Sequence, residues 1–361
     1  MEKPDKPEHA AYSGRGALSN PAPRFLHRHS AAVEDGWYRE EIPESIATQV
    51  RPEPARSIIA HNDSPDIPFE QSINPYRGCE HGCIYCYARP SHAYLDLSPG
   101  IDFETKIFYK ADAARLLEHE LAAPNYAVKP ITIGANTDPY QPVERELKVT
   151  RSLLEVLERT RHPVTLITKG TMILRDLDLL TSLNRDGLVN VFVSITTLDP
   201  ELKRTLEPRA AAPAARLRVV RELAAAGIPT GVLVAPIIPA INDMELERIL
   251  ATIAAAGASR AGYVLLRLPH ELKALFRQWL EQHLPDRAEH VMALIRSARD
   301  GLENDPNFGS RMRGSGPWAQ LLRDRFSLAC RRHGLSMDRM RALPTQHFRP
   351  PGRGGQLTLA L

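Results

Sequence analysis

Cysteine and long hydrophobic runs are both scarce in this sequence. Four cysteines among 361 residues are too few for a disulfide scaffold. The most apolar run, residues 232–241, is too short to cross a bilayer and contains two prolines. No apolar stretch follows the charged N-terminal residues, so we expect no secretory signal and no membrane partner. We therefore expect a cytoplasmic protein, where thiols stay reduced and clustered cysteines bind metal more often than they pair.

An excess of charge is also missing. The 46 Lys and Arg residues nearly balance the 43 Asp and Glu residues, and the net charge of +3 does not by itself predict nucleic-acid binding. An apolar fraction of 43% and a charged fraction of 25% exclude a wholly disordered or fibrous chain. Proline is the exception, because 30 prolines amount to about 8% of the chain, against a usual value of about 5%.

The sequence divides into three parts. Residues 1–65 are rich in proline and charge and lack helical or strand periodicity. They are predicted to form an extended N-terminal arm that is wrapped on the body or partly disordered. We expect the core domain at residues 66–270 and a helical, arginine-rich C-terminal extension at residues 271–361.

Short apolar segments alternate with amphipathic helical patterns in the core. We expect strands near residues 73–77, 131–134, 164–168, 191–195, 231–235 and 263–268. We expect helices at residues 150–161, 174–183, 214–226 and 244–256, and two more at 271–284 and 287–302. This alternation is typical of parallel βα units whose strands are buried on both faces. Six units fit a partial TIM-type barrel or a doubly wound open sheet, and periodicity alone does not distinguish them.

Three of the four cysteines lie within eight residues, just after the first predicted strand. Cys79, Cys83 and Cys86 have the spacing CxxxCxxC. Gly78 and Gly82 allow the loop to fold tightly enough for the three thiolates to converge.

Two kinds of metal centre fit these cysteines. Structural zinc sites usually have four ligands, but the fourth cysteine, Cys330, is 244 residues beyond Cys86. A zinc knuckle would therefore need His81 or His92 as its last ligand. Three thiolates instead leave one iron of a [4Fe–4S] cluster without a protein ligand and free to bind another molecule.

The cysteine spacing, with Tyr85 directly before the third cysteine, resembles the signature of the radical S-adenosylmethionine (SAM) superfamily. The resemblance covers about residues 70–270 and implies an α/β fold, the partial (β/α)6 TIM-type barrel of these enzymes. It also implies a [4Fe–4S] cluster whose open iron chelates the amino and carboxylate groups of SAM. Reductive cleavage of SAM then gives methionine and a 5′-deoxyadenosyl radical that abstracts hydrogen. A reducing electron donor of the flavodoxin or ferredoxin type is the implied partner.

Residues outside the three cysteines indicate which branch of the superfamily the sequence resembles. Tyr85 and Tyr87, on both sides of the third cysteine, are similar to the relay tyrosines of spore photoproduct lyase and are candidate catalytic residues. Tyr85 has a second candidate role, which is to pack against adenine. Residues 133–144 and 206–209 resemble the lyase-like group related to DNA repair photolyases. Residues 72–79 together with 311–317 resemble its bacterial branch, whose substrate is unsettled.

The resemblance also assigns residues to SAM. The segment that would contact the SAM amino group follows the second predicted strand and consists of Asn136, Thr137 and Asp138. Lys169, at the end of the third predicted strand, matches a lysine that contacts the SAM carboxylate, a favourable charge-assisted pairing. Ser194 would contact the methionyl or ribose groups, and the backbone near Ala235 would contact adenosine.

One position departs from the lyase. In spore photoproduct lyase, a cysteine two residues before the SAM-binding serine returns a hydrogen atom to the product radical. The matching positions hold Ala135 and Thr137, and a methyl group cannot donate hydrogen at a useful rate. We therefore do not expect thymine-dimer reversal by the lyase's route. Cys330 could replace that donor only if the C-terminal extension covered the barrel mouth, and we expect it to be a small buried residue instead.

The C-terminal extension carries the strongest local charge. Residues 307–353 contain ten arginines and two aspartates, which is +8 and leaves −5 for the rest of the chain. With Trp318, Phe326 and Phe348 between them, these arginines could hold a phosphate backbone while the rings stack on bases. The alternative is that the arginines are solvated or paired with acidic groups of the body.

Three arginines are candidate substrate contacts. Arg311 and Arg313 lie in a loop-like segment suited to an anionic group, and Arg209 follows Pro208 in a βα loop. Four acidic residues near predicted strands are expected at the surface or as helix caps: Glu144, Glu146, Asp199 and Glu207.

Three functions are consistent with these features. The first is a radical SAM enzyme that acts on a nucleic-acid or phosphate-bearing substrate. The second is a radical SAM enzyme that modifies a peptide or small metabolite. The third is a non-catalytic iron–sulfur or zinc protein that senses redox state or binds a partner. All three leave the oligomeric state open.

Overall fold

The computed structural model describes residues 13–26, 45–338 and 342–352. Its centre is a seven-stranded sheet in the order β10-β9-β8-β7-β6-β3-β2. The strands are β2 (Ile59–His61), β3 (Gln71–Ile73), β6 (Ile131–Ile133), β7 (Val164–Thr168), β8 (Val189–Ser194), β9 (Thr230–Ile237) and β10 (Arg260–Leu265). Every neighbouring pair is parallel except β2 with β3. The sheet is open between β2 and β10, so the predicted α/β partial barrel of six parallel strands is confirmed.

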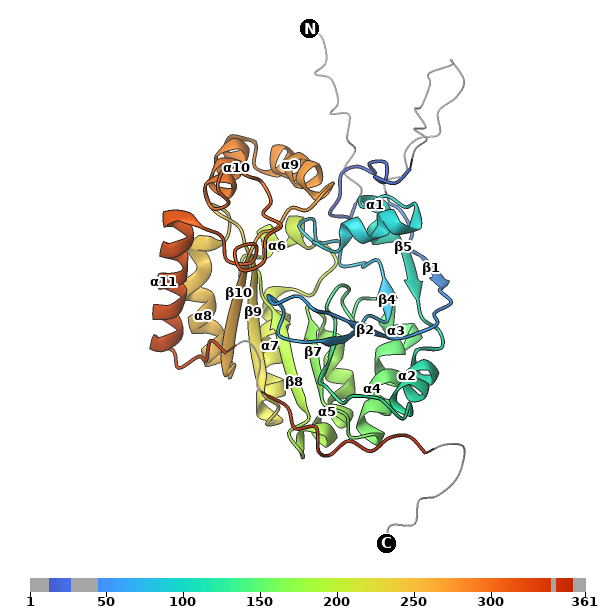
Figure 1. Ribbon diagram of the computed structural model, residues 1–361. Helices are drawn as coiled ribbons and strands as arrows, with labels where there is room; N and C mark the ends of the chain where they lie inside the picture. The colour runs from blue at the N-terminus through green and yellow to red at the C-terminus, as the bar shows by residue number, and fades with distance from the viewer. Residues whose placement is uncertain (1–12, 27–44, 339–341, 353–361) are drawn as a thin grey trace, which may run out of the picture.

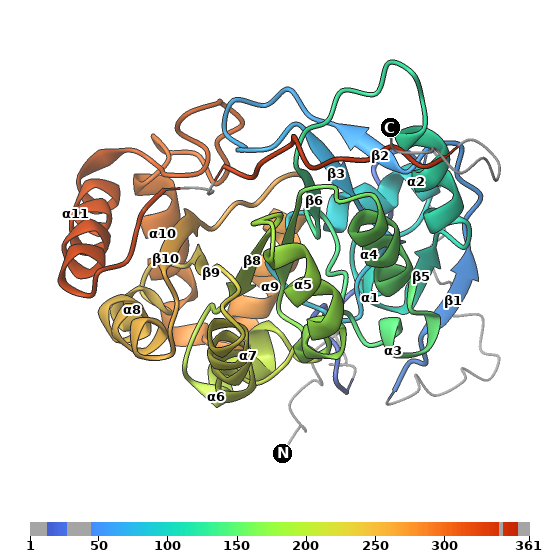
Figure 2. The same cartoon turned by 90° about the horizontal axis from the view of Figure 1, so that it is seen from below.

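Helices cover the outer face of the curved sheet, as Figures 1 and 2 show. They are α2 (Ala113–Leu121), α4 (Val149–Arg159), α5 (Leu177–Asn184), α7 (Pro213–Ala225), α8 (Leu246–Ala255) and α11 (Gly316–Arg332). Helix α4 shows why these segments are helical, since Val149, Leu153, Leu154, Val156 and Leu157 form one buried stripe. The strands contribute the other half of this core, because their side chains are buried on both faces.

The structure also contains further helices, 3-10 turns and a second sheet. The helices are α1 (Ile101–Thr105), α3 (Glu144–Leu147), α6 (Pro200–Leu206), α9 (Leu272–His283) and α10 (Ala288–Ser297). The 3-10 turns are η1 (Arg89–Leu95), η2 (Thr171–Asp176), η3 (Asp243–Glu245) and η4 (Pro285–Arg287). A small second sheet has the order β1-β5-β4, formed by β1 (Gln49–Pro52), β5 (Lys106–Tyr109) and β4 (Tyr76–Arg77). None of the described helices is long and apolar enough to span a membrane.

Most predicted elements lie within a few residues of the observed ones, and three differences bear on the site. The strand expected at residues 73–77 is two strands in different sheets, because Pro75 interrupts the backbone donors between β3 and β4. Strands β1 and β2 were not predicted, since each is only three or four residues long. Strand β10 ends at Leu265, earlier than expected. The divisions at residues 65 and 270 remain predictions.

The C-terminal extension packs against the core. Phe326 and Cys330 are buried in the main hydrophobic cluster, and Trp318 and Phe348 pack against it. Arg325 forms an ion pair with Glu247 at 2.8 Å. Base stacking by these three aromatic residues, which the sequence allowed, is therefore not supported. The expected burial of Cys330 is confirmed.

His162 makes stability depend on pH. Its side chain is buried, with Nε2 2.7 Å from the Tyr126 hydroxyl and Nδ1 3.0 Å from the Pro163 carbonyl oxygen. Burial lowers the pKa of His162 to about 4, although the Pro163 carbonyl opposes the shift. His162 therefore takes up a proton near pH 6.5 in the unfolded chain, but only near pH 4 in the native protein.

We expect the free energy of unfolding to fall by about 3 kcal/mol between pH 7 and pH 4 because of this one group. The stabilisation is complete above pH 6.5 and is lost as the pH approaches 4. Urea titrations at several pH values would measure it. His162→Gln keeps polar groups for Tyr126 and Pro163 but cannot titrate, so its stability should depend less on pH. An unchanged pH dependence in this variant would contradict the assignment.

Candidate functional site

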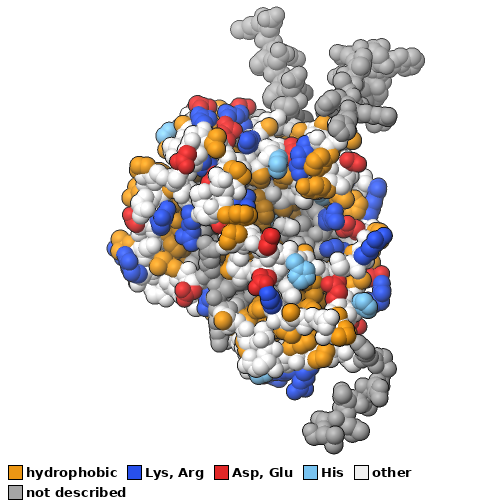
Figure 3. Space-filling view, viewed as in Figure 1, with side chains coloured by type: hydrophobic (Ala, Val, Ile, Leu, Met, Phe, Trp, Pro, Cys, Tyr) orange, Lys and Arg blue, Asp and Glu red, His pale blue; other side chains and the backbone are white. Residues whose placement is uncertain are grey.

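A cavity of about 480 Å³ lies at the carboxyl ends of the parallel strands. The cysteine loop forms one wall, and residues that end or follow β6, β7, β8 and β9 form others. This is the end at which (β/α) barrels carry their active sites. In the space-filling view of Figure 3, the middle of this face is hollowed and shows hydrophobic side chains. Segment 60–69 and Met312 close the side where the sheet is open.

The cysteine loop is held in a tight conformation. Gly78 and Gly82 both have positive φ angles, of 77° and 65°. A Cβ atom at Gly78 would lie 2.9 Å from the Phe103 carbonyl oxygen, so only glycine fits. The Cys79 N–H donates to the same oxygen at 2.9 Å, and the Cys86 N–H donates to the Cys83 carbonyl at 3.2 Å. The glycines therefore act as predicted for the loop's turn.

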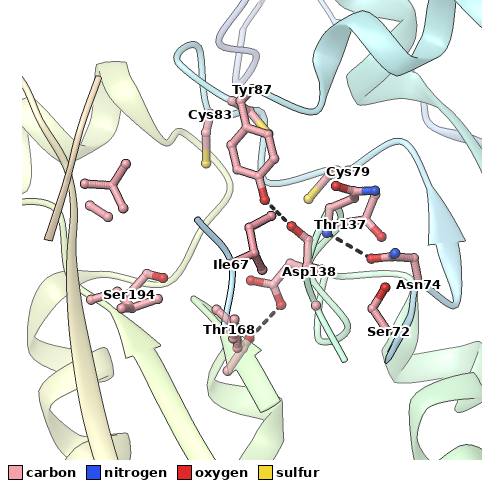
Figure 4. A pocket seen from close by; sticks show the side chains of 18 of the residues that line it. Ile67, Ser72, Asn74, Cys79, Cys83, Tyr87, Thr137, Asp138, Thr168 and Ser194 are labelled. Atoms are coloured by element: carbon pink, nitrogen blue, oxygen red, sulfur yellow. Dashed lines mark hydrogen bonds between the residues drawn. The ribbon is translucent and has the colours of Figure 1, made fainter. Parts of the chain in front are cut away.

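The three cysteines suit an iron–sulfur cluster. Cys79, Cys83 and Cys86 are all free thiols on the wall of the same cavity. The side chains of Cys79 and Cys83 point into one space, which Ser194 faces from the other side (Figure 4). Burial raises the pKa of Cys83 to about 12, so a bound cation would be needed to hold it as a thiolate at neutral pH.

A single zinc ion fits less well. Among the described residues, no three Cys, His, Asp or Glu side chains are placed to hold one metal ion. The two histidines considered as a fourth ligand have other partners. His81 Nδ1 is 3.3 Å from Asp138, and His92 Nε2 is 3.0 Å from the Lys106 carbonyl oxygen. The thiols thus fit a cluster with separate iron atoms better than a zinc knuckle.

A buried ion pair supports the cysteine loop from behind. Arg89 and Glu104 are fully buried and 2.5 Å apart. Arg89 also donates to the carbonyl oxygens of Cys83 and Gly82, at 2.8 Å and 3.1 Å. Glu104 accepts the backbone N–H of Gly16 at 2.9 Å, which ties residues 13–26 to the loop. The sequence does not predict this pair, because nothing in the spacing of Arg89 and Glu104 distinguishes them from surface charges.

The residues predicted to contact SAM line the cavity together with the cysteines. They are Tyr85, Asn136, Thr137, Asp138, Lys169, Ser194 and Ala235. Asn136 donates its backbone N–H to Asn74 Oδ1 at 2.9 Å, and Thr137 donates its hydroxyl to the Tyr76 carbonyl at 3.0 Å. The backbone after β6 is therefore fixed by the neighbouring strand segment. Figure 4 shows the hydrogen bond to Asn74.

Asp138 organises two strand ends. Its carboxylate accepts the Thr168 hydroxyl and the Lys169 backbone N–H, each at 2.6 Å, and the Tyr140 N–H at 2.9 Å. Burial would raise the pKa of Asp138, but His81 and these hydrogen bonds outweigh it and lower the pKa to about 2. Both oxygens are thus occupied by the chain itself, and Asp138 positions Lys169 at the end of β7.

Lys169 supplies a cation on the cavity wall. Its ammonium group lies 5.8 Å from the centre of the Tyr85 ring. Burial would lower the pKa of Lys169, but its electrostatic interactions with Cys83 and Glu207 outweigh burial and raise the pKa. Lys169 is therefore charged at neutral pH and available to an anionic ligand.

Tyr85 belongs to a buried network. Its hydroxyl donates to Glu207 and lies 3.1 Å from the Thr196 hydroxyl. Glu207 also pairs with Arg216, and both side chains are almost fully buried. Burial would raise the pKa of Glu207, but Arg216 and Lys169 hold it at about 2. Glu207 is the C-cap residue of α6, which is one of the two roles predicted for it. Its side chain is buried rather than at the surface, because its partners come from the cysteine loop, the segment after β8 and α7.

Two further acidic residues, Asp199 and Glu144, were also expected at the surface or as helix caps. Asp199 caps α6 by accepting the Glu201 N–H at 2.8 Å, as expected. Glu144 is fully buried rather than at the surface, and its carboxylate caps α4 by accepting the backbone N–H groups of Thr150 and Arg151 at 3.0 Å and 3.3 Å.

Tyr87 lies at the rim of the cavity. Its side chain is 49% exposed, and its hydroxyl donates to the Ala135 carbonyl oxygen. Figure 4 shows this hydrogen bond beside the cysteine loop. Ala135, the residue predicted to replace the lyase's hydrogen donor, is thus directly beside a tyrosine.

The three arginines predicted as substrate contacts do not line this cavity. Arg209 pairs with Glu80 at 3.2 Å, and Arg311 pairs with Asp66 at 2.5 Å. Arg313 lies over the Tyr263 ring at 4.9 Å and borders a second, more open hollow. The arginine that does line the cavity, Arg267, was not predicted. The expected strand at residues 263–268 placed it inside a strand, whereas it follows the end of β10.

One family model and several uncharacterized relatives match the sequence. The model of the radical SAM superfamily matches residues 73–253, half of the 361-residue chain. An uncharacterized protein of Mycobacterium tuberculosis is 38% identical over 232 residues, which cover 64% of this chain and 68% of that protein. An uncharacterized protein of Methanocaldococcus jannaschii is 25% identical over 219 residues, covering 61% and 78%.

Comparisons with solved structures agree on the fold. Spore photoproduct lyase complexed with dinucleoside spore photoproduct superposes with a TM-score of 0.58 and 18% identity, covering 79% of this chain and 80% of the lyase. A mutant of that lyase with bound AdoMet and dinucleoside spore photoproduct gives a TM-score of 0.56 at the same identity and coverage.

Proposed function

Because the chain belongs to the radical SAM superfamily, we propose that it is an enzyme that cleaves SAM with a [4Fe–4S] cluster on Cys79, Cys83 and Cys86. The family implies an iron–sulfur cluster and SAM. When bound, the reduced cluster supplies the electron that cleaves SAM to methionine and a 5′-deoxyadenosyl radical. The observation that carries the proposal is that the three free thiols share one cavity with Lys169 and the strand-end residues.

The chain's own residues would bind and orient SAM. Lys169 offers a charged ammonium group to the SAM carboxylate, and the backbone of residues 136–138 is held in place for the amino group. Ser194 and the backbone at Ala235 line the part of the cavity proposed for the methionyl, ribose and adenosine groups. The network of Glu207 and Arg216 fixes Tyr85, so its ring can pack against adenine. A reducing partner of the flavodoxin or ferredoxin type would deliver the electron.

We further propose a nucleic-acid or phosphate-bearing substrate. Two observations support this choice. The fold is similar to that of a lyase solved with dinucleoside spore photoproduct. Tyr87, proposed as a catalytic residue, lies exposed at the rim of the cavity, where a substrate would enter. The reaction would differ from the lyase's, because Ala135 has no hydrogen atom that it can readily donate.

Anaerobic reconstitution tests the proposal. The protein would be treated with iron and sulfide, and then given SAM and dithionite. We expect the visible absorbance of a [4Fe–4S] cluster and the formation of 5′-deoxyadenosine. If folded protein showed neither the cluster absorbance nor 5′-deoxyadenosine, the proposed enzyme activity would be wrong and a non-catalytic role would remain.

Lys169→Met should raise the KM for SAM by about 10- to 100-fold, because a hydrogen bond to a charged group contributes about 1.5–3 kcal/mol. The measurement is 5′-deoxyadenosine formation at a series of SAM concentrations. Lys273→Met, at an exposed position of α9, is the matched control and should behave like the unaltered protein. A KM for SAM that does not change in Lys169→Met would exclude Lys169 from the SAM site.

A further inference from the structure

We infer that Arg267 binds a phosphodiester group of a nucleic-acid substrate at the wall of the SAM cavity. This inference rests on the proposed function, which makes the cavity a radical SAM active site. Arg267 follows the carboxyl end of β10, next to Leu265 and Met312 on the wall. Catalytic and binding groups of (β/α) barrels are concentrated at these strand ends. The position is therefore suited to contact a ligand.

The guanidinium group of Arg267 is poorly satisfied by the protein. Its Nε is buried and has no hydrogen-bond partner in the described part of the chain. Its Nη1 makes a weak contact with the Met312 sulfur at 3.9 Å, and its Cζ lies 6.0 Å from the centre of the Tyr87 ring. A buried donor of a charged group without a partner is costly, and an oxyanion would satisfy it.

The charges around Arg267 leave one positive charge uncompensated. The charged groups that act on it are Arg311, Asp66 and Asp305, together with the Tyr87 hydroxyl. Asp66 is paired with Arg311 at 2.5 Å. Asp305 accepts the Asn307 N–H at 2.8 Å and balances the charge of buried Arg299. Arg267 therefore provides a single positive charge, which matches a singly charged oxyanion such as a phosphodiester.

Lys169 does not compete with Arg267 for the phosphodiester group. It follows β7 and is proposed to bind the SAM carboxylate, whereas Arg267 follows the edge strand β10, which is three strands away from β7. The cavity therefore holds two separate cations for two separate anionic groups. One is assigned to the cofactor, which leaves the other for the substrate.

Exposed aromatic rings favour a nucleic acid over an acidic peptide. Tyr87 is 49% exposed beside Arg267, and Phe308 is 59% exposed under the Arg311 guanidinium at 4.5 Å. Such rings, placed beside cations, can stack on unpaired bases while the cations contact the backbone. Tyr87 and Phe308 are not the aromatic residues that were expected to stack on bases, which are Trp318, Phe326 and Phe348.

The test compares charged and uncharged strands. A fluorescein-labelled single strand of six thymidines would be titrated at low salt, followed by the same strand with uncharged methylphosphonate linkages. Arg267→Gln should weaken binding of the phosphodiester strand by about 10- to 100-fold and leave the uncharged strand unaffected. Arg221→Gln, at an exposed position of α7, is the matched control and should bind both strands like the unaltered protein.

Three results would overturn the inference. One is equal affinity of Arg267→Gln and the unaltered protein for the phosphodiester strand. Another is a loss of affinity for a labelled glutamate-rich hexapeptide and not for the strand, which would assign Arg267 to a carboxylate. The third is a higher KM for SAM in 5′-deoxyadenosine formation with strand binding unchanged, which would place Arg267 in the SAM site. If the unaltered protein binds the strand but forms no 5′-deoxyadenosine, the proposed function fails while the phosphate contact stands.

Discussion

Cys86→Ala protein, reconstituted with iron and sulfide, is expected to lose the cluster absorbance and all SAM-dependent 5′-deoxyadenosine formation. Cys79, Cys83 and Cys86 are the free thiols on the wall of the cavity, so each must hold a different iron. Removing one leaves two ligands and a second open iron in a partly exposed site. Iron and sulfide analysis, together with product chromatography, would measure both losses. The unaltered protein should contain about four irons per chain.

Cys330→Ala is the matched control for this experiment. Cys330 is buried in α11 among hydrophobic side chains and does not line the cavity. The variant should lose about 1 kcal/mol of stability from a smaller core side chain but keep its cluster and activity. If Cys86→Ala retained four irons and activity, the cysteine loop would not be the cluster site. If Cys330→Ala lost them, the C-terminal helix would have to reach the cluster.

The chemistry of this site is largely predictable from the sequence, because it depends on local spacing. The positions of Cys79, Cys83 and Cys86 in one tight loop follow from CxxxCxxC and its glycines. Lys169 was assigned from the family resemblance, and β7, with its predicted bounds, places it where a residue just after a parallel strand reaches the cavity. Arg267 obeys the same rule after β10, but the predicted strand extended too far and concealed it.

The supporting charges could not be predicted in this way. Glu207 pairs with Arg216, and Arg89 pairs with Glu104, through contacts between elements that only the folded chain brings together. In the sequence, these residues resemble the charged positions of any surface helix or loop. Segment 60–69 is a similar case, since its strand has only three residues and its role on the cavity wall depends on pairing with β3. Burial of charge is a tertiary property, and periodicity does not report it.

Arg89→Met should lower the free energy of unfolding by about 3–5 kcal/mol, the usual cost of removing one partner from a buried ion pair. Arg89 donates to Glu104 and to four carbonyl oxygens, those of Gly82, Cys83, Pro99 and Gly100. Methionine fills much of the volume of the arginine side chain but leaves Glu104 as a buried carboxylate without a cation. Urea unfolding of the iron-free protein would measure the loss without a contribution from the cofactor.

Arg204→Met provides the matched control. Arg204 pairs with Glu201 on α6, where both side chains are about 70% exposed, at 72% and 69%. An exposed pair of this kind contributes less than about 1 kcal/mol, so the variant should unfold almost like the unaltered protein. A similar loss in the two variants would mean that burial of the Arg89–Glu104 pair has no special effect on stability.

A double-mutant cycle separates the ion pair from the other contacts of Arg89. Glu104→Gln removes the negative charge and keeps one acceptor oxygen, so it can accept from only one of the Gly16 and Ala17 N–H groups, which bind the two carboxylate oxygens at 2.9 Å and 2.8 Å. In Arg89→Met/Glu104→Gln no buried charge is left unpaired, so the double variant should be more stable than the sum of the single losses predicts. Both single variants should also bind less iron, because Arg89 fixes the backbone of the loop between Gly82 and Cys83. Additive losses with full iron content would mean that the pair stabilises the fold without shaping the cysteine loop.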